Sequence, residues 1–141
     1  MKTKKEVFMN IILPIMTGAV IYYIISPDVV FVQRIDAFIG TGMHAGEQAA
    51  RNDVTVLIRN YLPDILWAYA LTFSILFVTG NNTAHLRGTF LTAASFSTVM
   101  EILQLTPLVK GTFDVADIIV EVVAELVAVF IIKAQQGGRI T

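Results

Sequence analysis

The chain has 141 residues, of which 55% are hydrophobic and 15% are charged, and its formal net charge is −1 at pH 7. This composition departs from that of soluble globular proteins toward that of membrane proteins. The near-neutral charge argues against nucleic acid as a partner, because nucleic-acid binding calls for a basic face, and the absence of cysteine excludes disulfides, thiolate nucleophiles and cysteine-based zinc sites.

The first apolar stretch covers residues 7–25 and follows a short segment that contains three lysines. A secretory signal peptide begins in a similar way, but its apolar core has only about 7 to 15 residues. No small-x-small cleavage pattern follows this longer stretch, so we expect it to be retained as the first transmembrane helix. Within it, Pro14 predicts a kink, and Gly18 predicts close approach of a neighbouring helix.

Residues 28–61 form the longest segment between predicted spans and mix apolar with charged residues. Phe31, Ile35 and Phe38 recur at helical spacing opposite polar side chains, which is typical of an amphipathic helix at the membrane interface. Gly40 and the residues after it are expected to end that helix. The segment is then expected to return toward the bilayer.

Arg59 reaches the edge of the bilayer in this interpretation, and Lys110 lies at the same level. Three interpretations of Arg59 stay open. It is an interfacial anchor, an ion-pair partner of Asp64, or a ligand for the phosphate of a lipid head group.

Three further spans are predicted, at residues 62–79, 86–105 and 114–132. The first of these starts with a proline and an acidic residue, as helices often do. The second is rich in small residues, which let membrane helices pack closely. The predicted fold class is therefore all-α: residues 1–141 form one small polytopic membrane bundle of about four transmembrane helices, with an interfacial amphipathic segment in the first loop.

The distribution of positive charge predicts the orientation of this bundle. The two terminal tails and the loop between the second and third spans hold six of the ten Lys and Arg residues in short segments, and the other four are spread along the opposite side. By the positive-inside rule, both termini are cytoplasmic and the long first loop faces outward.

Polar residues of the last three spans converge in one half of the bilayer, because the second span starts where the third ends and the fourth begins. The residues at this level are Asp64, Glu101, Gln104, Asp114, Asp117 and Glu121. The four acids from Asp114 to Glu125 are spaced by three, four and four residues, which places them within an arc of roughly 80° on one helix face. Carboxylates crowded in a medium of low dielectric constant are expected to share protons or to hold a cation.

A purely structural interpretation competes with this one. Asp64, Asp114 and Asp117 lie in the first turns of predicted helices, where free N–H groups and the helix dipole favour acids. Glu101 and Glu121 lie deeper, so capping does not explain them. For these two glutamates, the alternative to a binding site is an interhelical hydrogen bond.

Two motifs in the C-terminal third resemble those of the VanZ-like membrane family. Glu101-Ile-Leu-Gln104 matches the E-x-x-Q of that family on one helix, and Phe113-Asp114-Val-Ala-Asp117 matches its F-D-x-x-D-like start of the next. Carried over position by position, Glu101, Gln104, Asp114 and Asp117 match. Glu121 stands where the family has an Asn, Thr112 replaces a frequent Arg, and Ala124 and Ala128 stand where glycines are common.

The resemblance implies a multi-pass protein of the bacterial cytoplasmic membrane, in a family named for a member associated with resistance to the glycopeptide antibiotic teicoplanin. It implies two partners, the lipid bilayer and an envelope lipid or glycopeptide-related ligand. The favoured function is an outward-facing acidic pocket within the membrane that binds an envelope-derived or amphiphilic ligand.

Two alternatives stay open: a membrane-embedded enzyme acting on a lipid-linked substrate, and a subunit of a proton- or cation-coupled transporter. A transporter with four spans would need a homo-oligomer. Whether the chain is an enzyme stays open, since no nucleophile motif is recognisable. No cofactor is expected, although the carboxylates are compatible with a divalent cation.

Overall fold

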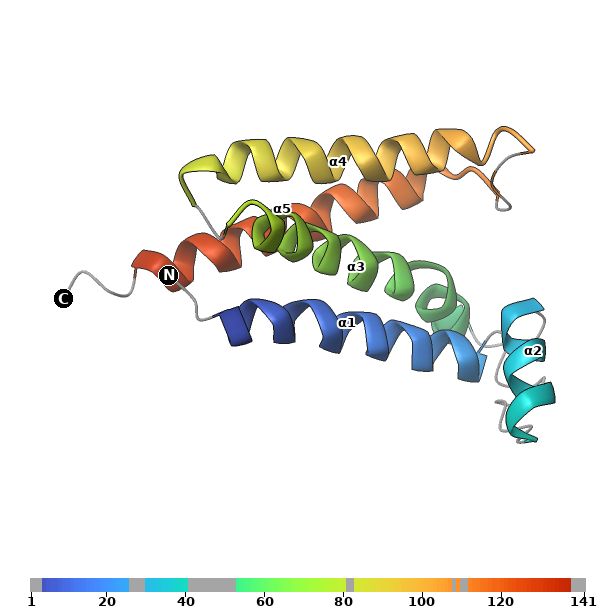
Figure 1. Ribbon diagram of the computed structural model, residues 1–141. Helices are drawn as coiled ribbons and strands as arrows, with labels where there is room; N and C mark the ends of the chain where they lie inside the picture. Colours follow the sequence, from blue (N-terminus) through green and yellow to red (C-terminus); the bar gives the residue numbers. More distant parts are fainter. Residues whose placement is uncertain are drawn as a thin grey trace.

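The computed structural model describes residues 4–25, 30–40, 53–80, 83–107, 109 and 112–137. All of the regular structure in these residues is helical (Figure 1), which confirms the predicted all-α class. The elements in chain order are α1 (Lys4–Ile25), α2 (Val30–Ile39), α3 (Asp53–Val78), the short 3-10 helix η2 (Thr83–His85), α4 (Leu86–Leu103) and α5 (Val115–Gly137).

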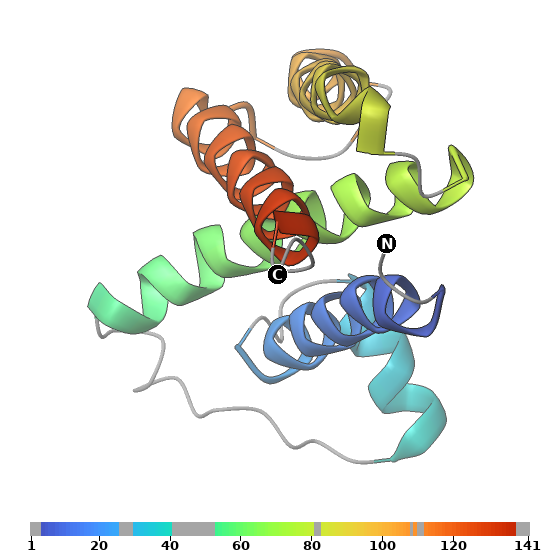
Figure 2. The same ribbon diagram turned by 90° about the vertical axis from the view of Figure 1, so that its left-hand side faces the viewer.

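The four long helices run alternately in opposite directions, and α3 lies in the middle of the bundle (Figure 1). It contacts α1, α4 and α5. Seen end-on, α4 and α5 lie on one side of α3 and α1 lies on the other (Figure 2). The start of α1 and the end of α5 share one end of the bundle, whereas α2 lies across the other end.

The core at the end where α1 begins joins three helices. Its buried members are Val7, Phe73, Leu76, Ala128 and Ile132. Beside this cluster, the Tyr69 hydroxyl donates a hydrogen bond of 2.7 Å to Oδ1 of Asn10. This contact satisfies two polar groups between α1 and α3 that are otherwise costly to bury.

Gly18 allows α1 and α3 to approach each other closely, as the sequence predicts. A Cβ atom on Gly18 would lie 3.8 Å from Cβ of Leu66 and 4.0 Å from Cα of Pro63. These are ordinary van der Waals distances, so the site has room for a methyl group and for little more.

Helices α1 and α3 are long and apolar enough to cross a membrane. Only 6% of the apolar window of α1 and 28% of that of α3 are buried, so the core does not account for their apolar surface. Each long helix also exposes large apolar side chains, such as Leu13 at 61%, Leu91 at 62% and Phe130 at 68%. Exposed apolar surface on this scale is typical of contact with a membrane or with other proteins.

Some predicted boundaries differ from those observed. Helix α3 begins at Asp53, before the predicted start at residue 62, and Pro63 lies inside it. Proline removes one helical hydrogen bond, which made it a plausible start, but membrane helices tolerate an internal proline. Helix α5 continues to Gly137, five residues beyond the predicted end at residue 132.

The predicted amphipathic segment is helical and corresponds to α2. Gly40 follows it with a φ of 73°, a left-handed conformation that glycine adopts without strain. Its N–H donates to the carbonyl of Asp36 at 2.8 Å. The rest of the first loop, residues 41–52, lies outside the described residues, and so does Lys110.

Candidate ligand-binding site

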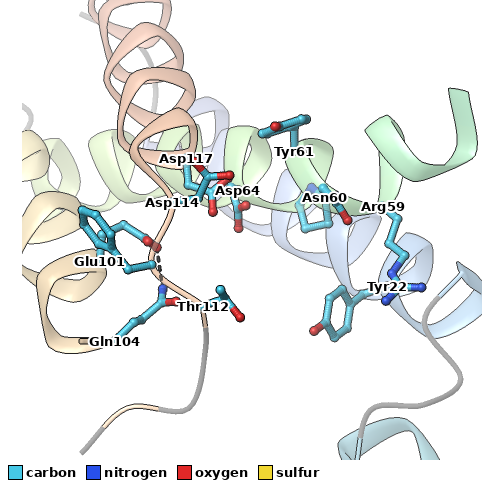
Figure 3. A pocket seen from close by; sticks show the side chains of 12 residues that line it. Tyr22, Arg59, Asn60, Tyr61, Asp64, Glu101, Gln104, Thr112, Asp114 and Asp117 are labelled. Atoms are coloured by element: carbon cyan, nitrogen blue, oxygen red, sulfur yellow. Dashed lines mark hydrogen bonds between the residues drawn. The ribbon is translucent and has the colours of Figure 1, made fainter. Parts of the chain in front are cut away.

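A cavity of about 480 Å³ lies where α3 and α5 begin and α4 ends (Figure 3). We call it the acid cavity because four of the side chains in its wall are carboxylic acids. The wall is made of Tyr22, Arg59, Asn60, Tyr61, Pro63, Asp64, Glu101, Gln104, Thr112, Phe113, Asp114 and Asp117. Antiparallel helices bring these segments together, because the end of one helix meets the start of the next.

Glu101 is a buried acid in this wall, with 7% of its surface exposed. Its Oε1 accepts a hydrogen bond of 2.5 Å from Nε2 of Gln104, one turn later on the chain. Its Oε2 is buried and meets no hydrogen-bond partner among the residues that the structure describes. Such an oxygen is costly unless a proton, a water molecule or a ligand satisfies it.

Asp114 has a capping role as well as a place in the wall. Its Oδ1 accepts a hydrogen bond of 2.8 Å from the N–H of Ala116, and its carbonyl accepts one of 3.2 Å from the N–H of Asp117. This is the side-chain contact of a helix N-cap. The structural interpretation of Asp114 is therefore confirmed, and the same residue lines the acid cavity.

The two ends of the acid cavity differ in the chemistry of their side chains. Glu101 and Gln104 lie toward one end, and Arg59 and Tyr22 lie toward the other, with Asp64 between them (Figure 3). The side chain of Arg59 points away from Asp64 in this view. The cavity therefore offers acceptors at one end and a cation with a phenol at the other.

Six of the seven candidate site residues line this one cavity: Arg59, Asp64, Glu101, Gln104, Asp114 and Asp117. The seventh, Glu121, is not in the wall. It lies one turn farther along α5 than Asp117 and is 5% exposed. The spacing of the acids predicts that Glu121 lies on the same helix face as Asp117. It does not predict how far along α5 the cavity extends.

Sequence reasoning missed several residues of the wall. Asn60 and Phe113 are adjacent in the sequence to the candidate residues Arg59 and Asp114, so their place in the wall could have been predicted. Tyr61 is typical of an aromatic-belt or packing residue in the sequence, and in the structure it lines the cavity. No sequence pattern predicts that Tyr22 lines the cavity, because its position depends on the axial register between α1 and α3.

A second cavity, of about 400 Å³, lies farther along the bundle between α1, α3 and α5. Its wall is apolar apart from Tyr69 and contains residues such as Pro14, Leu66 and Val123. It offers no charged group to a ligand. Of these two cavities, only the acid cavity has charged side chains in its wall.

The acid cavity suits a ligand that brings positive charge and hydrogen-bond donors, because ionised carboxylates only accept hydrogen bonds. Among the described residues, no three His, Asp or Glu side chains are grouped so that they could hold a metal ion. Comparisons with protein-family models, with curated proteins and with solved structures found no match to this chain.

Proposed function

We propose that this chain is a four-span, VanZ-like protein of the bacterial cytoplasmic membrane whose acid cavity binds the head group of an amphiphile of the cell envelope. The four antiparallel helices support the topology, since α1 and α3 are apolar enough to span and α4 and α5 pack beside α3. The four residues that match the VanZ-like motifs all lie in the cavity wall.

The observation that carries the proposal is the buried Oε2 of Glu101 in the wall of the acid cavity, which has no hydrogen-bond partner among the described residues. Asp64 and Asp117 line the same space from α3 and α5. An ammonium group supplies a positive charge and three N–H donors. An ammonium group would therefore donate a hydrogen bond to Oε2 of Glu101 and also compensate the negative charge of the surrounding carboxylates.

Arg59 and Tyr22 extend the recognition to an anionic group. A guanidinium binds phosphate through two parallel hydrogen bonds, and a phenol adds a further donor. The two ends of the cavity thus fit a head group that has an ammonium at one end and a phosphate at the other. The volume of about 480 Å³ is in the range of small-molecule pockets and favours a head group over a whole glycopeptide.

The binding test uses purified protein in detergent and short-chain lipids with different head groups. We expect phosphatidylethanolamine to raise the thermal stability, because a ligand at 100 times its Kd stabilises the folded state by about 2.7 kcal/mol. Phosphatidylglycerol has the phosphate without the ammonium and should stabilise less. Glu101→Gln should weaken the effect of phosphatidylethanolamine by at least tenfold in concentration.

Asp53→Asn is the matched control, because Asp53 is an exposed acid at the start of α3 and is absent from the cavity wall. It should bind phosphatidylethanolamine as the unchanged protein does. Equal stabilisation by both lipids, or an unchanged response of Glu101→Gln, would contradict binding of an ammonium in the acid cavity. The link to glycopeptide resistance stays a prediction of the resemblance.

A further inference from the structure

The seam between α4 and α5 holds buried polar side chains beyond the acid cavity. On α4, Ser97 is 1% exposed, and on α5, Glu121 and Glu125 are 5% and 0% exposed. The Ser97 hydroxyl donates a hydrogen bond of 2.8 Å to Oε1 of Glu125. The Oε2 atoms of Glu121 and of Glu125 are buried and have no hydrogen-bond partner in the described part of the chain. The binding of a head group uses neither glutamate.

These glutamates continue a row of acids that starts in the cavity. Asp117 lines the cavity, Glu121 follows four residues later, and Glu125 follows after four more. Residues four apart on an α-helix lie on the same face and about 6 Å apart along its axis. An acidic side chain therefore stands at each turn between the cavity and Ser97.

The charged groups that act on Glu121 are themselves carboxyls. They are Asp64 from α3, Glu101 from α4, and Asp117 and Glu125 from α5. None of these groups supplies a positive charge. A buried acid without a counter-charge is favoured in its neutral form, and the added proton gives it an O–H that can donate a hydrogen bond.

Beyond Glu125 the described part of the seam holds no further acid. Ala93 on α4 and Ala128 on α5 are both fully buried, and the next buried polar side chain on α4 is Thr89, whose hydroxyl is not an acid. The row of acids therefore connects with the acid cavity and not with the opposite end of the bundle.

We propose that Glu121 and Glu125, with Ser97, form a proton-binding site that is loaded from the acid cavity. A proton passes from one carboxyl to the next along α5 through an intervening water molecule, which accepts one proton as it gives up another, so that the donor becomes a carboxylate as the acceptor becomes neutral. No bond other than O–H is made or broken. This gives the protein a function beyond binding a head group, because it can take up and release protons within the bundle.

Infrared spectroscopy of the purified protein tests this site directly, because a neutral carboxyl has a C=O band that a carboxylate lacks. We expect this band at neutral pH, and we expect it to shift in D₂O as the O–H exchanges with solvent. Glu121→Gln and Glu125→Gln should each remove a component of the band. Asp53→Asn, which changes an exposed acid, should leave the band unchanged.

Ser97→Ala gives a second measurement should either glutamine variant fail to fold. It deletes the hydrogen bond to Oε1 of Glu125 and should shift the frequency of the C=O band without removing it. The proposal is overturned by an unchanged protein that lacks the band, by a band that does not shift in D₂O, or by a band that neither glutamate substitution nor Ser97→Ala alters.

Discussion

Asn10 and Tyr69 connect α1 to α3 through one pair of side chains. The Tyr69 hydroxyl donates to Oδ1 of Asn10, while Nδ2 of Asn10 donates to the carbonyl of Glu6 at 2.7 Å. Tyr69 also packs against Phe73, with 4.9 Å between the ring centroids. The ring of Tyr69 therefore belongs to the apolar core and its hydroxyl to the interface with α1.

Tyr69→Phe keeps the ring and removes only the hydroxyl. We expect it to lower the free energy of unfolding by about 0.6 kcal/mol, the average for hydrogen bonds between membrane helices, and by about 1.7 kcal/mol at most. Denaturation in detergent measures this change. A double-mutant cycle with Asn10→Ala is the control, because partners in contact show non-additive effects. Strictly additive losses would mean that the hydrogen bond contributes nothing to stability.

At the scale of whole helices, Gly18 lies at the contact between α1 and α3. A methyl group at this position would reach ordinary contact distance from Leu66, so we expect a much longer side chain to clash with α3. Gly88 on α4 is different, because a Cβ there meets nothing within 4 Å. The two glycines therefore form a matched pair for testing the packing of α1 on α3.

Gly18→Ala should stabilise the protein by about 0.5 to 1 kcal/mol, the gain from replacing glycine within a helix. Gly18→Leu should destabilise it by about 1 to 3 kcal/mol through overpacking. Gly88→Leu should be tolerated. Thermal unfolding in detergent measures all three variants, and a Gly18→Leu protein as stable as Gly88→Leu would contradict the close approach of α1 and α3.

At the scale of the whole molecule, the helices alternate in direction (Figure 1). The acid cavity, whose wall includes Tyr22 near the end of α1, therefore lies at the opposite end of the bundle from the start of α1. The chain contains no cysteine, so a single introduced thiol reports on one position alone. Thr112, in the cavity wall, and Thr79, just after α3, are both exposed and mark opposite ends of the bundle.

In intact cells, Thr112→Cys should react with a membrane-impermeant maleimide from outside, because the proposed orientation places the cavity end outward. Thr79→Cys should react only after the membrane is permeabilised. The opposite pattern would reverse the orientation and leave the four-span bundle intact. Labelling of both positions from the same side would contradict the proposed topology.

The bundle and most of its cavity follow from the sequence because antiparallel helices must bring the start of one helix to the end of another. That rule predicts from the sequence alone that Asp64, Glu101 and Asp117 lie at a similar depth along the bundle axis. The predicted start of α3 at residue 62 was wrong. Proline is favoured in the first turn of a helix, so Pro63 indicated a start, whereas the observed helix begins at Asp53 and contains Pro63. Tyr22 depends on the register between two helices, which no local pattern encodes.

The seam between α4 and α5 has a consequence for how the chain enters the bilayer. Helices α1 and α3 meet the requirements for a membrane span on their own. Glu101 on α4, and Glu121 and Glu125 on α5, would instead face lipid if either helix left the translocon alone. Polar and ionisable side chains are costly in contact with lipid. Ser97 and Glu125, which share a hydrogen bond across the seam, are 28 positions apart in the chain. The proposed topology therefore requires α4 to wait at the translocon until α5 has been synthesised, so that the two helices pass into the lipid together as a hairpin.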